Sequence, residues 1–357
     1  MSQYNRTYII QLHDTLQTVA DTYGYTSLDL QTYHNTFCDL DKRIVMGINR
    51  LSEVILPPLG RSLENGVLIP LKGKQKEVDF YYNKSVNNNI SRLNNNYGII
   101  IKEQNNGSAI KRRNYTVNMM FKEISKSNLY TIELNKTQTY IDYKEPTLLA
   151  ETLAQKLGEP LFPVKIGVDK KGEFVAVLNQ ELVFEKWKNT KEAIEQYYKS
   201  AFVTNLINKT EAAYRNKNKI KKALLQNIFF TFYFSGIYTA YGNKLAFQKK
   251  MNIPLYPFYK EVEYTVIQSV EPYLNSIGKI VIHQKGYVSD KRTSEDIKQK
   301  KDYPFYNDAV PLEGELQITY FLEPKTHIIT SIVGYITLYL NKRIERKIKI
   351  EGYLLKK

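Results

Sequence analysis

The pattern of hydrophobic and polar positions first predicts a small unit that runs strand, helix, helix, strand. β-rich runs cover residues 7–12 and residues 54–56. Between them, apolar residues at helical spacing predict a helix over residues 14–23, which Asp14 or Thr15 can cap, and a second helix over residues 27–33. The first 58 residues therefore form a compact βααβ pattern.

The pattern changes after residue 58. Residues 59–76 are rich in Gly, Pro and Lys and predict a linker with one short strand. Alternating polar and apolar positions then predict antiparallel strands on both sides of a mainly helical segment at about 182–250. We therefore expect an α+β fold, in which a small βααβ module at 1–58 is followed by a larger antiparallel-sheet domain at 77–357 with a helical insertion.

Two segments of the chain stand out by their charge, one because it has no charged residue and one because it has many. Residues 223–243 contain no charged side chain and are long enough to span a bilayer. Polar residues interrupt this run at about every fourth position, which favours a buried amphipathic helix over a membrane span. The charged stretch 289–302 predicts a solvated loop or a short helix.

Charge is distributed unevenly along the chain, whose formal net charge is +15. Residues 1–58 hold four basic and six acidic residues, which makes that segment −2 and the remainder +17. A basic body attracts nucleic acid, an anionic membrane, acidic envelope polymers or an acidic protein, and charge alone selects none of these. The single cysteine, Cys38, cannot form an internal disulfide bond.

The N-terminal residues resemble LysM domains, which the family pattern describes as a strand, a Gly-Asp-Thr-Leu turn, two helices and a closing strand before Pro. The resemblance rests on residues 8–16 (YIIQLHDTL), Val19-Ala20, Leu28, residues 33–35 (YHN) and residues 54–57 (VILP). It covers about 50 of the 357 residues. His13 departs from the family pattern, where Gly is usual, and the stretch 39–50 is longer and more charged than in compact modules.

LysM domains bind N-acetylglucosamine-containing glycans such as peptidoglycan in a shallow groove, and the resemblance implies where that groove would lie. The candidate glycan or docking residues are His13, Asp14, Thr15, Leu16, Asn35, Asp39 and Ile44. Asn35 is expected to hold a turn by bonding its own backbone. The alternative is that the unit docks on a protein, because a single copy lacks the multivalency that usually accompanies glycan binding.

Catalytic and metal-binding motifs are absent from the sequence. The four His residues are scattered, and neither an HExxH helix nor a Gly-x-Ser-x-Gly or Gly-rich phosphate loop occurs. We therefore predict no catalytic residues, no metal site and no cofactor. The basic clusters at 111–115 and 215–222 have no nucleic-acid-binding motif beside them, so nucleic acid is not the favoured partner.

The run Tyr-His-Asn-Thr-Phe-Cys at residues 33–38 is similar to LysM proteins associated with contractile injection machines, including type VI secretion systems of Bacteroidetes-like bacteria. No secretory signal opens the sequence, which predicts a cytoplasmic protein that reaches the envelope, if at all, with such a machine. The sequence hypothesis is a non-enzymatic adaptor that docks to the apparatus or to peptidoglycan and binds a protein partner. The alternative is an effector or envelope-acting enzyme that the N-terminal unit targets to the cell wall.

Overall fold

The computed structural model describes residues 6–355, apart from residues 12, 46, 59–60, 65–66, 71–75, 126, 138, 257–259, 306–311 and 342–343. The chain divides into two compact units. The first unit comprises Met1–Val78 and Tyr273–Lys279. The second comprises Asp79–Pro272 and Ile280–Lys357.

The first unit contains two helices and two separate two-stranded antiparallel sheets, β1-β2 and β3-β4. Its elements are β1 (Arg6–Ile9), α1 (Leu16–Tyr23), α2 (Ser27–Phe37), a 3₁₀ turn (Leu40–Lys42), β2 (Glu53–Leu56), β3 (Arg61–Glu64) and β4 (Val67–Pro70). Thr15 caps α1; the sequence suggests Ser27 as the cap of α2, but Thr26 fills that position. Gly24 ends α1 with φ 73°, a conformation that glycine adopts without strain. The core of the unit consists of Val19, Ala20, Leu30, Ile44, Ile48, Val54 and Leu56.

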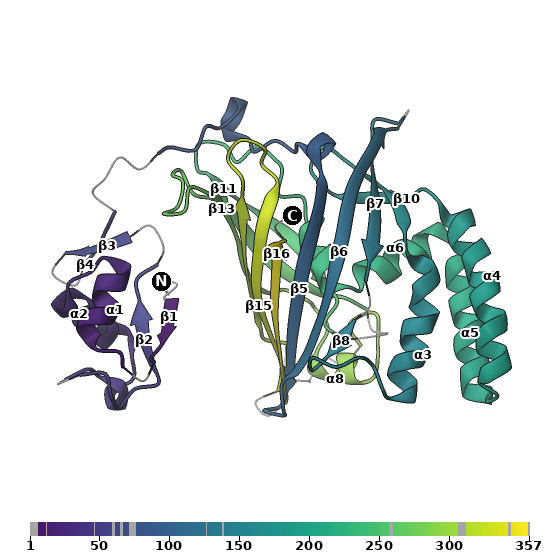
Figure 1. Cartoon of the computed structure of the whole chain (residues 1–357), viewed down its shortest axis with the longest axis horizontal. Coiled ribbons are helices and arrows are strands. Elements are labelled where there is room, and N and C mark those ends of the chain that lie inside the picture. Colours follow the sequence, from purple (N-terminus) through teal and green to yellow (C-terminus); the bar gives the residue numbers. More distant parts are fainter. Residues whose placement is uncertain are drawn as a thin grey trace. The chain divides into compact units, whose positions relative to one another are not determined.

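The second unit is built on one antiparallel sheet of 12 strands (Figure 1). Its strands are β5 (Asn94–Asn105), β6 (Lys111–Ile124), β7 (Tyr130–Lys136), β8 (Tyr140–Ile141), β9 (Val164–Val168), β10 (Phe174–Val177), β11 (Ala246–Ile253), β12 (Val262–Val270), β13 (Ile280–Val288), β14 (Glu315–Leu322), β15 (Ile329–Asn341) and β16 (Ile344–Leu354). Its helices are α3 (Leu149–Gly158), α4 (Gln180–Tyr197), α5 (Ala201–Tyr214), α6 (Lys217–Leu225), α7 (Ile228–Tyr233) and α8 (Ser294–Lys298).

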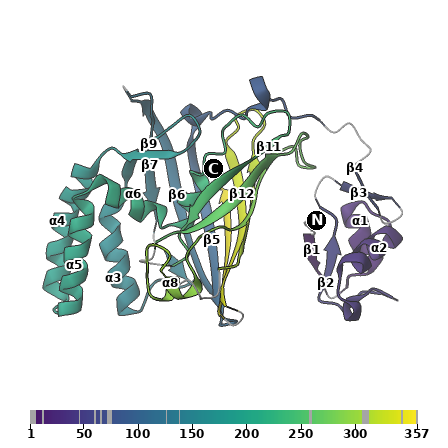
Figure 2. The ribbon, with the colours of Figure 1, turned by 180° about the vertical axis from the view of Figure 1, so that it is seen from behind.

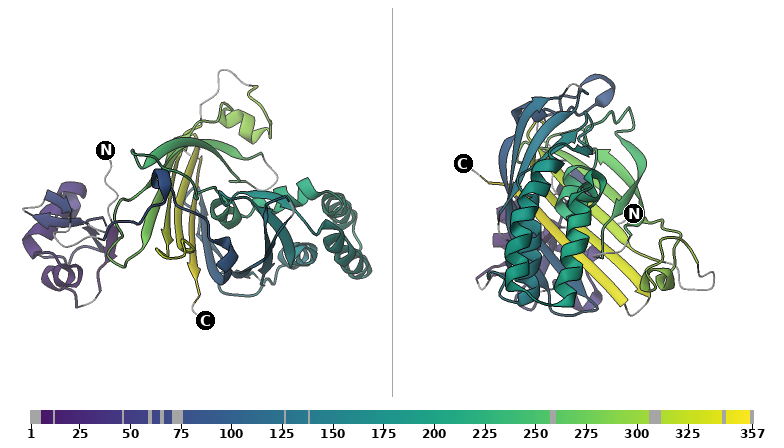
Figure 3. Two further views of the ribbon diagram at one scale, coloured as in Figure 1. Left: turned by 90° about the horizontal axis from the view of Figure 1, so that it is seen from above. Right: turned by 90° about the vertical axis from the view of Figure 1, so that its right-hand side faces the viewer.

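The order of strands in this sheet is β10-β9-β7-β6-β5-β16-β15-β14-β13-β12-β11, with β8 beside β6. The last strand of the chain, β16, therefore lies between β5 and β15 and joins the strands on both sides of the helical segment. Strand direction rotates progressively across the sheet, as the intrinsic twist of β-strands requires (Figure 3). Helices α3, α4 and α5 stand side by side at the β10 end, and α6 packs on β10 (Figures 1 and 2).

The fold class expected from the sequence is wrong. The described structure is mostly one large antiparallel sheet, and no LysM module is evident beside it. The expectation rested on residue types at helix and strand spacing in the first 58 residues. Such spacing fixes local elements, which many small α+β units share, and does not by itself specify one fold. In the second unit, two β-rich runs joined by a turn with Gly172 predict a hairpin at residues 163–178, and this is confirmed: β9 and β10 are antiparallel, with Gly172 at φ 82° in the turn.

The uncharged run at 223–243 is not the single helix expected: it contains the last residues of α6, then α7, and residues 234–243 are not helical. The break falls at Gln226 and Asn227, where the Asn227 side chain accepts a hydrogen bond from the backbone N–H of Phe229 and so starts α7. Within α7, Phe229, Phe230 and Phe232 are almost completely buried. Among the described helices, none combines the length and the apolar character that crossing a membrane needs.

Helix α7 lies close to the inner face of the sheet, which we define as the face that α7 covers. The Tyr97 hydroxyl of β5 donates to the carbonyl of Ile329 and lies 3.3 Å from the Tyr233 hydroxyl. The Tyr320 hydroxyl of β14 donates to the carbonyl of Phe232 at the end of α7. Because these hydroxyls are buried, each bond removes a desolvation penalty as well as fixing the position of the helix.

Gly352 of β16 lets α7 approach the sheet. A Cβ atom at this position would lie 2.9 Å from Cε2 of Phe229 and 3.3 Å from Cδ1 of Ile99. The Phe229 ring cannot easily move away, since it also packs against Tyr97. The closest packing of helix and sheet therefore depends on the absence of a side chain at Gly352.

We predict that Gly352→Ala lowers the free energy of unfolding by about 1–3 kcal/mol, because the added methyl overpacks the contact with Phe229. Gly158→Ala is the matched control, since nothing lies within 4 Å of a Cβ at the end of α3, and it should leave stability unchanged or slightly higher. Urea unfolding followed by circular dichroism measures both variants. Equal stability of the two would contradict this account of α7.

Candidate functional site

The seven candidate residues in the first unit differ in how far they are exposed to solvent. Leu16 packs against the hydrophobic core that contains the buried Ile44. His13, Thr15 and Asp39 are exposed. Leu16 and Ile44 thus belong to the core of the unit, while the glycan or docking role of the exposed candidates stays a prediction.

Asp14 and Thr15 both organise the turn before α1. Oδ2 of Asp14 accepts hydrogen bonds from the Tyr8 hydroxyl at 2.6 Å and from the backbone N–H of Gln11 at 2.7 Å. The bond from Tyr8, and then the bond from Gln11, lower the pKa of Asp14. Thr15 forms a capping box with Thr18. Of the two residues expected to cap α1, Thr15 does so and Asp14 holds the turn.

Asn35 and His34 fix the segment after α2. The Asn35 side chain donates to the carbonyl of Ile44 and accepts from its backbone N–H, so it bonds a residue nine positions away rather than its own backbone. The buried His34 accepts from the N–H of Ile55 at Nδ1 and lies 2.9 Å from the carbonyl of Lys42 at Nε2. His34 therefore connects α2 with β2, a role that no sequence motif indicated.

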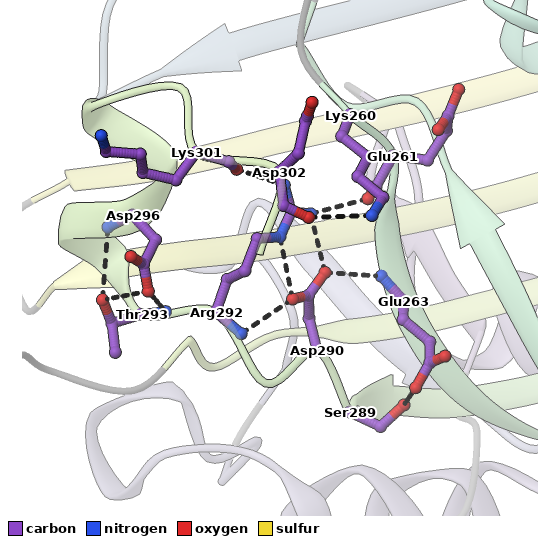
Figure 4. A network of polar contacts seen from close by, with 10 residues as sticks. All are labelled: Lys260, Glu261, Glu263, Ser289, Asp290, Arg292, Thr293, Asp296, Lys301 and Asp302. Carbon is purple, nitrogen blue, oxygen red and sulfur yellow. Dashed lines mark hydrogen bonds and ion pairs between the residues drawn. The ribbon is translucent and has the colours of Figure 1, made fainter. Parts of the chain in front are cut away.

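In the second unit, a buried ion pair anchors the charged stretch 289–302 (Figure 4). Asp290 accepts hydrogen bonds from the guanidinium group and the backbone N–H of Arg292, and from the backbone N–H of Glu263 on β12. Arg292 also donates to the carbonyls of Glu261 and Lys301. Burial raises the pKa of Asp290, but the bonds from Arg292 outweigh burial, so the pKa is lowered.

The expected short helix in this stretch is α8, and the stretch is tied to β12 rather than fully solvated. Thr293 and Asp296 form the capping box of α8, and Asp296 also accepts from the backbone N–H of Phe305. Asp290, Arg292 and Asp296 each bond backbone groups, so we assign this network a structural role.

We predict that Arg292→Ala lowers the free energy of unfolding by about 3–5 kcal/mol, because it leaves the Asp290 carboxylate buried without its partner. Lys291→Ala removes the same charge at the neighbouring exposed position and should change stability by less than about 0.5 kcal/mol. The lowered pKa of Asp290 adds a pH test. Its stabilisation is present above the normal range of Asp and is lost as pH falls through the lowered value, so the two variants should converge in stability in acid.

The outer face of the large sheet, opposite α7, offers the clearest candidate site. Along β16, Ile348 and Ile350 are buried on the inner face, and Lys347, Lys349 and Glu351 alternate with them on the outer face. The same alternation continues across the neighbouring strands. Large side chains on this face stay exposed, among them Ile267 (55% exposed), Tyr287 (63%), Tyr335 (48%) and Tyr353 (43%).

Three cations occupy directly opposed positions at the centre of the outer face. Lys349 of β16 is the register partner of Lys102 of β5, and Lys102 is the partner of Arg112 of β6. We call these three residues the cation row. Directly opposed side chains on one face of an antiparallel sheet have Cβ atoms about 4.5–5.5 Å apart, and like charges at this spacing are destabilising.

Beyond Lys349, the directly opposed positions on the next strands toward the other edge of the sheet are Tyr335, Gln317 and Lys285. Burial lowers the pKa of Lys285 to about 8. The Lys349 ammonium lies 2.6 Å from Oε1 of Glu351 and 5.3 Å from the centre of the Tyr335 ring. Burial lowers the pKa of Lys349, but the bonds to Glu351 and Tyr335 outweigh it, so this pKa is raised.

At the other end of the row, the Arg112 guanidinium lies 4.2 Å from the centre of the Tyr143 ring and donates to the Tyr143 hydroxyl. Its Nε atom is buried and has no hydrogen-bond partner among the described residues. The sequence pointed to Arg112 as part of a basic cluster. It did not point to Lys102 or Lys349, because only the pairing of β16 with β5 brings those two residues together.

Comparisons with known proteins add little to this geometry. No family model matches the chain, and no curated protein matches it. Among solved structures, a lipovitellin chain described under "lipid-protein interactions in lipovitellin" is similar over 73% of this chain and 24% of its own length, with a TM-score of 0.39 and 10% identity. The chain thus spans about a quarter of that protein, and a likeness at this level carries no functional argument. Among the described residues, no group of three or more His, Cys, Asp or Glu side chains could hold a metal ion.

Proposed function

We propose that the protein is a non-enzymatic adaptor whose outer sheet face binds an acidic partner protein through the cation row. The observation that carries this proposal is the direct cross-strand opposition of Lys349, Lys102 and Arg112. Their mutual repulsion costs stability in the free protein, and an acidic partner removes that cost on binding. The exposed tyrosines around the row supply the aromatic contact area that protein interfaces favour.

The surroundings of the row favour a protein over a continuous polyanion. On the same face, Glu351 lies next to Lys349 and Glu315 lies next to Gln317. These carboxylates repel a chain of phosphates, whereas a protein partner can place its own cations opposite them. The partner that fits this face is therefore an acidic protein surface. Binding of nucleic acid is the alternative that the experiment below tests.

The setting of this adaptor rests on the sequence. The run at residues 33–38 supports a place in a contractile, type VI-like secretion machine, and the exposed His13, Thr15 and Asp39 support docking of the first unit on the apparatus or on peptidoglycan. The division of the chain into two compact units also fits an adaptor, because one unit can dock while the other binds a partner.

For the cation row, Lys102→Glu should change stability and binding in opposite directions. Without a partner, the variant should unfold at a higher temperature than wild type, because the new carboxylate attracts both Lys349 and Arg112. In fluorescence anisotropy, the same variant should bind a labelled glutamate-rich peptide about tenfold more weakly. A single-stranded oligonucleotide of equal charge serves as the competing probe.

Lys217→Glu is the matched control for that experiment. Lys217 is exposed in the first turn of α6, where a carboxylate is favourable, so the control makes the same charge change away from the sheet. It should keep nearly wild-type affinity for the peptide. If Lys102→Glu binds the peptide as tightly as the control does, or if the oligonucleotide binds more tightly than the peptide, the proposed partner class is wrong.

Docking of the first unit is tested by co-sedimentation of the full chain with purified peptidoglycan, in salt that screens the charge of the second unit. The double substitution of His13 and Asp39 by Ala should leave the protein in the supernatant, while wild type pellets. Thr15 is left intact because its loss would remove the cap of α1 and about 1 kcal/mol of stability. The exposed pair Arg50 and Glu53, both replaced by Ala, is the control and should pellet like wild type.

If wild type also stays in the supernatant, glycan is not what the first unit binds. The search for its docking partner then moves to the proteins of the secretion apparatus.

A further inference from the structure

A cavity of about 230 Å³ lies on the inner face of the sheet, between β5, β6, β7, β16 and the start of α7. Its apolar wall comes from Ile101, Ile228, Pro254 and Ile348. Its polar wall comes chiefly from Glu103, Arg113, Tyr115 and Lys136. Successive residues of a strand point to opposite faces of the sheet. The cavity on the inner face is therefore separate from the cation row on the outer face.

Cations outnumber carboxylates at this cavity. Glu103 is shared between Arg113, to which it is hydrogen-bonded, and Arg346, whose Nη2 lies 3.4 Å from Oε2. Among the residues that line the cavity, Arg113 and Lys136 therefore face the single carboxylate of Glu103, which leaves a net charge of +1 when Lys136 is protonated. Arg346 does not line the cavity, and its guanidinium also donates to Oδ1 of Asn105, so the ion pair with Arg346 takes up part of the charge of Glu103. Buried positive charge that the chain does not neutralise favours an anionic ligand.

Lys136 is the cation best placed to receive that ligand. Its ammonium group donates to the Thr139 hydroxyl at 2.8 Å and lies 4.7 Å from the centre of the Tyr115 ring. Burial, and then the nearby Arg113, lower the pKa of Lys136 to about 8. Two of the three donors of the ammonium remain for a ligand once the bond to Thr139 is made.

The groups around Lys136 hold the polar wall in position. Tyr115 of β6 donates from its hydroxyl to Oδ1 of Asn227, which also caps α7. Burial raises the pKa of Tyr115, so its hydroxyl stays protonated. The other ionisable groups on the strands facing Lys136 are Arg113 of β6 and Glu103 of β5. The site is thus built before any ligand arrives, which lowers the entropic cost of binding.

From this arrangement we infer that the cavity is a binding site for a small organic carboxylate, with the carboxylate at Lys136 and Arg113 and an apolar group against Ile101 and Ile348. The volume is below the range of about 300–1,000 Å³ typical of sites for drug-sized ligands, so the ligand has one short apolar group. The apolar wall disfavours inorganic phosphate, which would lose its hydration there without gaining polar partners.

The experiment is isothermal titration calorimetry of the full chain with benzoate, with neutral benzamide of the same shape, and with inorganic phosphate. Benzoate should bind at least about tenfold more tightly than either of the others. Affinity for benzoate should fall as pH rises through about 8, where Lys136 loses its proton in the free protein. The carboxylate stabilises the ammonium form, so the heat of binding near this pH should depend on the buffer in the way that proton uptake requires.

Two variants locate the site. Lys136→Met keeps most of the length of the side chain and removes its charge, so it should weaken benzoate binding at least about tenfold and abolish the pH dependence. Glu103→Gln should strengthen benzoate binding, because it removes the competing carboxylate, and it keeps the test open if Lys136→Met does not fold. The inference is overturned if benzoate does not bind, if benzamide binds equally well, or if phosphate binds more tightly. It is also overturned if the variants bind benzoate like wild type.

Discussion

The close contact between α7 and the inner face of the sheet is the constraint on which the second unit depends. α7 is only six residues long, so its own hydrogen bonds do not stabilise it in isolation. Its stability comes from burial of Phe229, Phe230 and Phe232 against strands that precede and follow it in the sequence. The sheet in turn needs α7, because strands with one apolar face require an element that covers it. Helix and sheet therefore form together, and the absence of a side chain at Gly352 sets how closely they pack.

The period of two residues along each strand separates two functions. Arg112 and Arg113 are neighbours in the sequence, yet Arg112 belongs to the cation row on the outer face and Arg113 lines the inner cavity. The outer row has cations opposed to one another, whereas the inner group shares one carboxylate between two arginines. The first arrangement suits a broad acidic surface, and the second suits a single small anion. One strand can therefore contribute to two sites of different chemistry.

The sequence predicted local elements much better than it predicted their assembly. The hairpin β9-β10 was readable because its strands are joined by a short turn with Gly172, and α1 was readable from its cap and Gly24. The pairing of β16 with β5 was not readable, since about 250 residues separate Ile101 from its partner Ile350. The LysM-like spacing predicted the wrong fold class for a related reason, because periodicity determines which residues are helical and not how helices and strands pack.

The candidate sites follow the same division. Asp14, Thr15 and Asn35 were found from the sequence, and their capping and turn bonds are local or span a few residues. Lys102 and Lys349 had no sequence signal, because each is an ordinary lysine at a polar strand position until the register opposes them. Lys136 also had no sequence signal, since its importance comes from burial beside Tyr115 and Arg113. Long-range strand pairing thus creates the features that local patterns cannot show.

The position of β16 between β5 and β15 also has a consequence for synthesis on the ribosome. Until residues 344–354 emerge, β5 and β15 both present unpaired backbone edges, and no ladder of backbone hydrogen bonds joins the described strands before and after the helical segment. The sheet is consequently completed only after nearly all of its residues are translated. During that interval the nascent chain exposes two templates for intermolecular strand addition, which makes it a natural client for a holdase chaperone.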